Sequence, residues 1–422
     1  MNFEEAKLYI NSLNKFGSVL GLENIKALCD ELSNPEDDLK FIHVTGTNGK
    51  GSTCAFITSI LKASGIKAGS YNSPAVICEY DQYRIDDEMI DEDTYASALT
   101  KVAAAVEVLN ERGISPTRFE VETVMAFVMF RDAGCELVVL ETGLGGRDDA
   151  TNVVKNTILH VFASISPDHM FILGNTLAEI ADVKSGIIKS SAPTIIYNAD
   201  ESATEVIVNR ANKCGSPVTI ITADDVKKNN YELSLKGTYQ KTNSCIALAV
   251  INELKNQGYD ITDDAIEMGL KSAHIPFRFE VLPFKDNANG ASEELTIILD
   301  GAHNEDGAYK LVDSLKSEYP ARDYVFVTGI FKDKDYEKIA EIISGIASEV
   351  IVTENDLSNR ALSKQILTKT YEKYINKVAQ YDKIEMCIDK GIEAVKANQN
   401  AILILSGSLS WLNRAKEYIM GI

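Results

Sequence analysis

Short apolar runs rich in β-branched residues alternate along this chain with longer stretches in which apolar residues recur every three or four positions. The runs LKFIHVTG from Leu39, CELVVLETG from Cys135 and TILHVFASIS from Thr157 predict strands that are buried on both faces, as in a parallel sheet. Helical spacing covers roughly residues 92–112 and 119–132, between the first two runs. This alternation of strand and helix predicts an α/β fold.

The same alternation continues to the C-terminus and predicts a second sheet. The segments APTIIYN and PVTIITAD predict further strands of the first sheet, while TIILD, DYVFVTG, EVIVTEN and AILILSGS predict a smaller open sheet. The polar segment FKDNANGASEE, residues 284–294, has no apolar periodicity and is predicted to be a linker or boundary loop. We therefore predict a larger N-terminal domain of residues 1–283, with a mostly parallel sheet, and a smaller Rossmann-like α/β domain of residues 295–422.

The net charge and the distribution of cysteines limit the classes of binding partner and the cellular compartment that we expect for this protein. The formal net charge of -20 repels polyanions, which excludes nucleic acid and anionic membranes as main partners. Seven cysteines are dispersed without a Cys-x-x-Cys pair, as is typical of a reducing compartment. The N-terminal sequence MNFEEAKLYI does not have the pattern of a signal peptide, and no apolar stretch is long enough to cross a bilayer. We therefore predict a cytoplasmic protein that binds neither nucleic acid nor membrane.

The stretch HVTGTNGKGST, residues 43–53, joins the first predicted strand to a predicted helix. A strict phosphate-binding loop would have glycine at position 44 and a hydroxyl directly after the Gly-Lys pair. The chain has Val44 and Gly51 at these two places. Because the strict pattern fails, one interpretation is an ordinary glycine-rich turn with a solvent-exposed Lys50.

The physics of anion binding gives the same stretch a second interpretation. Gly46, Gly49 and Gly51 allow backbone N–H groups to face an anion at the N-terminus of a helix, where Lys50 adds positive charge. Ser52 lies close enough in sequence for its hydroxyl to reach a magnesium ion. On this interpretation the larger domain is of the P-loop type.

A second group of polar residues follows the strand that ends at Glu141. Glycines come directly after this acid, and ligands bind at the carboxyl ends of strands in open α/β sheets. A carboxylate there suits a magnesium ion that also takes phosphate oxygens. The alternative is a solvated acidic residue in a turn.

Two histidines and one lysine are weaker candidates when each is considered alone. His169 and His303 both follow predicted strands in polar motifs, although a single histidine is more often structural. Lys184 lies on the helix after His169, where a lysine is ordinarily a solvated surface charge.

Taken in order, these segments resemble the folylpolyglutamate synthase and dihydrofolate synthase family of the Mur ligase superfamily, and the resemblance spans most of the chain. The segments that carry it are IHVTGTNGKGS (42–52), SP (73–74), YRID (83–86), FEVETVMAF (119–127), ETGLGGRDDATN (141–152), SPDHMFILGNTLAEIADVKSGIIK (166–189), GTYQKTN with Gln240 and Asn243, FRFEVL (277–282), DGAHN (300–304) and SGSL (406–409). This family uses a shortened phosphate loop that ends in Gly-Lys-Gly-Ser, so the departure from the strict pattern supports the resemblance.

The resemblance implies roles for individual residues. It makes residues 1–283 an ATP-binding, Mur-ligase-type central domain. The implied ATP contacts are Thr47, Asn48, Gly49, Lys50, Gly51, Ser52, Asn243, Arg278, Asp300 and His303. The implied magnesium ligands are Ser52, Glu141 and, for a second ion, His169. The implied catalytic residues are Lys50, Lys184, which is carbamylated in the family, and His303.

The chain departs from the family pattern at three places. It has Pro276-Phe277-Arg278 where Pro-Gly-Arg is common, Ala75-Val76 where His-Leu follows Ser-Pro, and Tyr239 where histidine precedes the glutamine. These departures concern the expected contacts to adenine and pteridine more than the phosphate chemistry.

The implied reaction is the ATP-dependent addition of L-glutamate to a folate through an acyl phosphate, with release of ADP and phosphate. The substrates would be L-glutamate and either tetrahydrofolate or dihydropteroate, the metal Mg²⁺, and the enzyme a monomer. One alternative is another Mur-type amino-acid ligase, although those chains usually carry a further N-terminal domain, whereas this phosphate loop begins near residue 45. The other is a P-loop ATP-binding protein without ligase activity, which leaves the GAHN and SGSL motifs unexplained.

Overall fold

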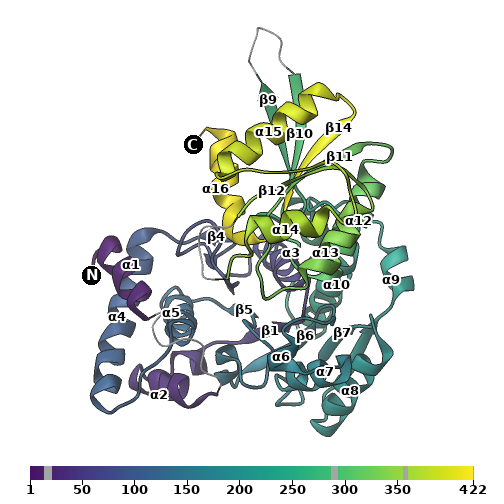
Figure 1. The fold of residues 1–422 in the computed structure, drawn as a ribbon. Helices are drawn as coiled ribbons and strands as arrows, with labels where there is room; N and C mark the ends of the chain where they lie inside the picture. The colour runs from purple at the N-terminus through teal and green to yellow at the C-terminus, as the bar shows by residue number, and fades with distance from the viewer. Residues whose placement is uncertain (14–20, 287–292, 355–359, 422) are drawn as a thin grey trace. The chain divides into compact units, whose positions relative to one another are not determined.

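The protein forms two compact units, each built around its own sheet (Figure 1). The computed structural model describes residues 1–13, 21–286, 293–354 and 360–421. The first unit contains residues 1–234 and 241–274, and the second contains residues 235–240 and 275–422.

The first unit contains a sheet with the strand order β4-β3-β2-β5-β1-β6-β7-β8 among the described residues. Central strand β1 (Phe41–Thr45) pairs in parallel with β5 (Leu137–Glu141) and β6 (Thr157–Phe162). The other strands are β2 (Ala68–Tyr71), β3 (Tyr83–Ile85), β4 (Glu88–Met89), β7 (Thr194–Tyr197) and β8 (Val218–Ile221). The pairs β2–β3 and β3–β4 are antiparallel, and the other described pairs of this sheet are parallel. The carboxyl ends of β1, β5 and β6 therefore meet at one edge, where open α/β sheets bind ligands.

Helices of the first unit pack against this sheet and against one another. They are α1 (Phe3–Ser12), α2 (Glu23–Glu31), η2 (Pro35–Asp38), α3 (Lys50–Ala63), α4 (Glu92–Glu111), α5 (Arg118–Asp132), η3 (Ala150–Val153), α6 (Met170–Leu173), α7 (Leu177–Ser185), α8 (Glu201–Lys213), α9 (Ala223–Lys228), α10 (Gln240–Asn256) and α11 (Asp263–Ser272). Helix α3 contacts β1, β2, β5 and α11. In Figure 1, α1, α2, α4 and α5 gather at the left of this unit, while α7 and α8 lie together at its right.

Local sequence explains why the central elements form where they do. Every residue of β1 and β5 is buried, as the continuous apolar runs predict. Helix α5 begins after Thr117, whose hydroxyl accepts from the N–H of Glu120 while the Glu120 carboxylate accepts from the N–H of Thr117. Thr176 and Glu179 form the same reciprocal cap at the start of α7. Such caps satisfy backbone N–H groups that a helix leaves unpaired, and they fix where each helix begins.

The second unit contains a smaller sheet with the order β13-β12-β11-β14-β10-β9 among the described residues. Its strands are β9 (Glu280–Asp286), β10 (Glu293–Asp300), β11 (Asp323–Thr328), β12 (Ala347–Val352), β13 (Val378–Gln380) and β14 (Ala401–Ser406). Its helices are α12 (Glu305–Glu318), α13 (Tyr336–Ser344), α14 (Lys364–Tyr371), α15 (Ile384–Ala397) and α16 (Leu409–Met420). All neighbouring strands are parallel except β9 and β10. The predicted α/β class, with a larger mostly parallel sheet followed by a smaller sheet, is confirmed.

The predicted boundary at residues 284–294 differs from this division into units. Residues on both sides of the polar segment belong to one antiparallel pair, in which Phe284 of β9 lies opposite Leu295 of β10. Pro283 also lies within β9, which is tolerated because β9 is an edge strand. The second unit instead begins at residue 275 and includes residues 235–240. Residues 287–292 of the predicted linker lie outside the described residues.

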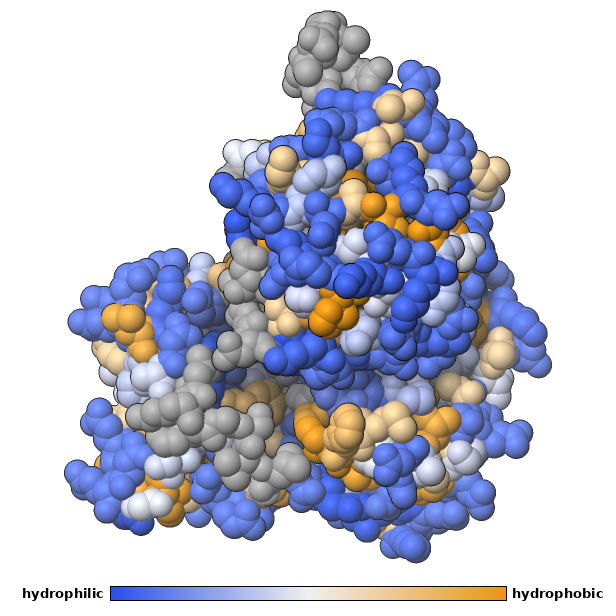
Figure 2. Space-filling view, viewed as in Figure 1, coloured by the Kyte–Doolittle hydropathy of each residue, from blue (hydrophilic) through white to orange (hydrophobic). Residues whose placement is uncertain are grey.

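The surface matches the high charge of the sequence. Most of the face seen in Figure 2 is hydrophilic, with smaller hydrophobic areas between. Across the described ranges, every helix is too short or too polar to span a bilayer.

Candidate active site

The glycine-rich loop lies between the end of β1 and the start of α3. Gly46 has φ 153° and Gly49 has φ 88°, values at which a side chain is strained. A Cβ atom on Gly49 would collide with the side-chain amide oxygen of Asn243. Gly49 is the N-cap of α3, so the loop ends where backbone N–H groups of the first turn are available to an anion. The predicted strand, glycine loop and helix are therefore present.

The segment that follows β6 fixes the backbone of this loop. The N–H of Thr47 donates to the carbonyl oxygen of Ser164 at 2.7 Å, and the Thr47 hydroxyl donates to the carbonyl oxygen of Ser166 at 2.9 Å. In return, the hydroxyl of Ser164 donates to the carbonyl oxygen of Asn48 at 3.1 Å. These three hydrogen bonds fix the backbone of residues 47 and 48 against the segment after β6.

Lys50 folds back over the glycine loop. Its Nζ donates to the carbonyl oxygens of Gly46 and Thr47, each at 3.2 Å. The same Nζ lies 3.7 Å from Oε1 of Glu141 at the end of β5. The Lys50 side chain is only 16% exposed, which excludes the alternative of a freely solvated lysine. A cation and a carboxylate thus meet beside the start of α3.

Glu141 is a buried acid, because only 6% of its surface is exposed. Its Oε2 accepts a hydrogen bond of 2.9 Å from the side-chain amide of Asn72, and the Asn72 amide oxygen accepts from the hydroxyl of Ser70. Asn72 follows the short strand β2, which the sequence pattern did not predict. The only sequence signal for it is a polar residue directly before Ser73-Pro74. The interpretation of Glu141 as a solvated turn acid is therefore wrong.

The donors here suit a hard divalent cation that arrives with a phosphate ligand. Within the described residues, no group of three or more His, Cys, Asp and Glu side chains could hold a metal ion by itself. Mg²⁺ commonly takes only one or two protein oxygens and completes its shell with phosphate oxygens and water. The buried carboxylate of Glu141 and the buried hydroxyl of Ser52, in the first turn of α3, fit that requirement.

Lys184 is buried, although its helix position alone suggested a solvated lysine. Its surface is 3% exposed, and its Nζ donates to the carbonyl oxygen of Gly46 at 2.8 Å. Lys50 and Lys184 therefore share one backbone acceptor. Burial, together with the positive charge of Lys50, lowers the pKa of Lys184 to about 7. A substantial fraction of this amine is neutral near pH 7, and only a neutral amine can act as a nucleophile.

His169 lies close to these residues in sequence but is solvent-exposed. It has φ 50°, in the left-handed region, and is the N-cap residue of the short helix α6. Its Nε2 lies 3.8 Å from Oδ1 of Asp168, and its side chain is 39% exposed. An exposed imidazole beside a carboxylate is accessible to a ligand from solvent.

The remaining predicted nucleotide contacts lie in the second unit, apart from Asn243, which lies beside Gly49 in the first. Asp300 ends β10 and is buried. Its Oδ2 accepts from the Tyr239 hydroxyl at 3.0 Å and from the N–H of Phe279 at 2.8 Å, while Oδ1 accepts from the N–H of Ala302 at 2.8 Å. Burial raises the pKa of this carboxyl, and the charge of Arg278 partly offsets that effect. Asp300 thus fixes the loops that carry Arg278 and His303.

His303 is oriented by its own loop. Its Nδ1 lies 2.7 Å from the carbonyl oxygen of Gly301, so Nδ1 carries the proton because a carbonyl oxygen can only accept. Arg278 lies close to the same glycine, since a Cβ atom there would be 3.2 Å from Nη1 of Arg278. The second unit therefore brings Arg278, Asp300 and His303 together.

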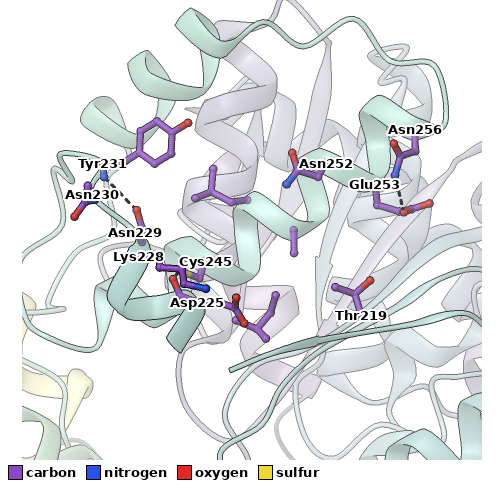
Figure 3. Close-up of a pocket in the computed structure, with 13 residues that line it drawn as sticks. Thr219, Asp225, Lys228, Asn229, Asn230, Tyr231, Cys245, Asn252, Glu253 and Asn256 are labelled. Carbon is purple, nitrogen blue, oxygen red and sulfur yellow. Dashed lines mark hydrogen bonds between the residues drawn. The ribbon is translucent and has the colours of Figure 1, made fainter. Parts of the chain in front are cut away.

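A separate pocket of about 440 Å³ lies elsewhere in the first unit. Figure 3 shows Asn252, Glu253 and Asn256 of α10 on one side of it, and Asn229 and Tyr231 from the loop after α9 on the other. Among the described residues that line it, none is a predicted site residue.

Comparison with known proteins assigns the chain to one class. Residues 44–261 match the family model of the Mur ligase middle domain, and residues 278–409 match that of the Mur ligase glutamate ligase domain. The dihydrofolate synthase/folylpolyglutamate synthase of Bacillus subtilis is 31% identical, and the alignment covers 98% of each chain.

Solved structures agree over the whole chain. Folylpolyglutamate synthase of Mycobacterium tuberculosis, complexed with ADP and AMPPCP, has a TM-score of 0.89 and 25% identity, covering 99% of each chain. Escherichia coli FolC in complex with DHPP and ADP has a TM-score of 0.84 and 26% identity, covering 99% of this chain and 98% of the other. The chain belongs to the folylpolyglutamate synthase and dihydrofolate synthase family of the Mur ligases.

Proposed function

We propose that this ligase uses ATP to join the amino group of L-glutamate to a carboxyl group of a folate. The names of its relatives support this proposal: the Bacillus subtilis relative is named for both dihydrofolate and folylpolyglutamate synthesis. The Mycobacterium tuberculosis structure contains ADP and AMPPCP, and the Escherichia coli structure contains DHPP and ADP. The acceptor is then tetrahydrofolate, dihydropteroate or both.

The reaction must overcome the poor reactivity of a carboxylate. An oxygen of the folate carboxylate attacks the γ-phosphorus of ATP, the bond to the β-phosphate oxygen breaks, and ADP leaves. The resulting acyl phosphate is attacked by the neutral α-amine of glutamate, and the tetrahedral intermediate expels inorganic phosphate while the amine loses a proton. Such a reaction depends mainly on positioning and on charge stabilisation.

The observation that carries the proposal is the meeting of Lys50, Lys184 and Glu141 at the glycine loop. Lys50 lies over that loop, where its charge would offset the β- and γ-phosphates. Thr47 would hold the loop through its bonds to the segment after β6. Asn48, Gly49 and Gly51 would contribute backbone N–H groups, and the start of α3 would add its partial positive charge. The positive charges of Lys50 and of the helix start act at short range, although the chain as a whole carries a net charge of -20.

Ser52 and Glu141 would hold one Mg²⁺, and His169 would help to hold a second. When bound, such an ion neutralises phosphate charge and orients the γ-phosphate. The support is the buried carboxylate at the end of β5 and the exposed imidazole at the start of α6. The chain's own part is to hold Glu141 in place through Asn72.

Lys184 would act after carbamylation of its amine. The neutral amine bonds to carbon dioxide, loses a proton and becomes an anionic carbamate, which replaces a cation by an oxygen ligand. Burial supports this step because it lowers the pKa of Lys184 to about 7. Lys184 would then orient groups beside the phosphate loop without contributing positive charge to it.

Asn243, Arg278, Asp300 and His303 would complete the nucleotide contacts. Arg278 and His303 would contact the nucleotide directly. Asp300 would act by holding their two loops, since both of its oxygens accept hydrogen bonds from the protein.

An assay of ADP release separates this function from its alternatives. We expect release that requires both L-glutamate and a folate, with dihydropteroate and tetrahydrofolate tested side by side. Release that requires a different amino acid and acceptor would favour another Mur-type ligase. Release that requires neither would favour an ATP-binding protein without ligase activity.

We also propose that the enzyme acts as a monomer in the cytoplasm. All seven cysteines lie in the described parts of the chain and are free thiols, which supports a reducing compartment. Light scattering of the purified protein tests the oligomeric state.

A further inference from the structure

The turn that carries Arg278 has an unusual backbone on both sides of that residue. Phe277 has φ 57° and Phe279 has φ 53°, both in the left-handed region that favours glycine. Both phenylalanine side chains are almost fully buried, at 0% and 1% exposure. A bulky residue keeps this conformation only where its surroundings hold it.

Packing and two hydrogen bonds hold Phe277 in place. Its N–H donates to Oε2 of Glu280 at 3.1 Å, and its carbonyl oxygen accepts from the N–H of Gly301 at 2.8 Å. Lys416 of α16 forms an ion pair with Glu280, and its Nζ lies 5.7 Å from the centre of the Phe277 ring. The ring is thus fixed between the protein interior and a cation above it.

The other side of Arg278 is fixed independently. The N–H of Phe279 donates to Oδ2 of Asp300, which also accepts from the hydroxyl of Tyr239. Arg278 therefore lies between two anchored residues, and their backbone angles set the direction in which its side chain leaves the turn. Its guanidinium passes close to Gly301, where a Cβ atom would crowd Nη1.

We propose that Phe277 is a positioning residue for Arg278, because its buried ring holds the left-handed turn that presents the guanidinium to a phosphate-bearing nucleotide. This inference rests on the proposed function, in which Arg278 contacts ATP. Removal of the ring leaves the steric penalty of a Cβ atom at positive φ but removes the packing that opposes it. The turn then relaxes and Arg278 changes direction.

The test is the affinity of the purified enzyme for the analogue AMPPCP, measured by calorimetry, together with KM for ATP. We expect Phe277→Ala to weaken binding about tenfold, within the coupling range of contacting residues. Phe277→Leu keeps apolar bulk and should recover most of that loss, and it also serves if the alanine variant does not fold. KM for L-glutamate should stay within about twofold, because the contact proposed for Arg278 is with the nucleotide.

A double variant separates positioning from general loss of stability. In the Arg278→Ala background, Phe277→Ala should weaken AMPPCP binding no further, since there is no guanidinium left to orient. The matched control is Phe326→Leu, which alters a fully buried phenylalanine of β11 in the same unit. It should lower the melting temperature and leave AMPPCP affinity unchanged.

Two results would overturn the inference, and they have different meanings. If Arg278→Ala weakens binding while Phe277→Ala does not, or if the two losses add, Phe277 serves only in packing. If Arg278→Ala itself leaves binding unchanged, the assigned contact between Arg278 and ATP is wrong, and the inference fails with it. The ligase reaction is judged separately, by ADP release that depends on glutamate and folate.

Discussion

The glycine loop of the first unit and the Arg278 turn of the second both place backbone in the left-handed region, but by opposite means. Gly46 and Gly49 adopt positive φ because they have no Cβ atom, and Asn243 lies so close to Gly49 that a Cβ atom would collide with it. Phe277 and Phe279 adopt similar angles with large, buried rings. We propose that the first region presents backbone N–H groups to a phosphate, whereas the second directs the side chain of Arg278.

The difference shows what holds the backbone of each region in its conformation. A non-glycine residue in a sparsely populated region costs about 1–3 kcal/mol, and burial of an aromatic ring contributes roughly 1.5–3 kcal/mol in return. Packing can therefore hold the turn. The glycine loop, for which we propose a bound phosphate, is fixed instead by hydrogen bonds to the segment after β6.

We expect the largest loss of activity when the charge of Lys50 in the glycine loop is removed. Lys50→Ala should lower glutamate- and folate-dependent ADP release by about 10³-fold, because the transferred phosphate loses its nearest charge stabilisation. Circular dichroism should remain that of the parent protein. Lys62→Ala, in the exposed last turn of the same helix, is the matched control and should keep full activity. Undiminished turnover of Lys50→Ala would show that the loop is misassigned.

A side chain at Gly49 of the glycine loop should reduce activity far more than a side chain at Gly65, which has open space around it. Gly49→Ala adds both strain at φ 88° and a collision with Asn243, so we expect activity to fall about 10²-fold as the loop is displaced. Gly65→Ala adds only strain, since φ is 72° and no atom lies within 4 Å of the new Cβ. It should cost about 1 kcal/mol of stability and no activity. Equal losses of activity in both variants contradict a specific role for Gly49.

We expect a smaller effect on activity when the Asn72 amide, which donates to the buried Glu141, is removed. Asn72→Ala removes the hydrogen bond to Oε2 of Glu141, so the Mg²⁺ concentration for half-maximal activity should rise about tenfold. AMPPCP affinity, measured by calorimetry with and without Mg²⁺, provides a readout independent of turnover. The difference between the two conditions should shrink in the variant, and an unchanged difference would show that Asn72 does not tune the metal site.

The last prediction concerns stability and pH and expects no change in the phosphate loop itself. The pKa of Lys184 is about 7 in the folded protein, below the ordinary value of 10.5, so the unfolded chain binds more protons between these two values. The buried Lys184 therefore destabilises the folded protein by its full amount below pH 7, and this destabilisation disappears as pH rises towards 10.5. Lys184→Met should gain about 3 kcal/mol more in unfolding free energy at pH 6 than at pH 9.

Urea unfolding at the two pH values measures this difference. Lys213→Met, which alters an exposed lysine of α8, should give the same change at both pH values. A pH-independent gain in Lys184→Met would contradict the lowered pKa.

Carbamylation of Lys184 gives a separate prediction on activity. Lys184→Ala should lose activity, and short carboxylic acids should restore part of it.

The sequence predicted the central strands because burial on both faces leaves continuous apolar runs, as in β1, β5 and β6. It also predicted that Glu141 ends a strand at the sheet edge where ligands bind. It missed β2, since AGSY is short and contains small residues, and so it missed Asn72 at the end of that strand. It placed a boundary at a polar segment that β9 and β10 flank, because a proline and polar residues obscure an edge strand.

The burial of Lys184 and the backbone of Phe277 could not be predicted from local pattern. A helical lysine is usually solvated, and only tertiary packing places the Lys184 amine on the carbonyl oxygen of Gly46. The φ angle of Phe277 depends on Gly301, Glu280 and Lys416, which are distant in sequence or act through their side chains.

A crystal structure with AMPPCP and Mg²⁺ tests the central assignment most directly. We predict that the triphosphate lies on the backbone of residues 47–52, with Lys50 Nζ beside the terminal phosphates and a divalent ion bound to Glu141. A triphosphate bound away from this loop, with no ion at Glu141, would contradict it.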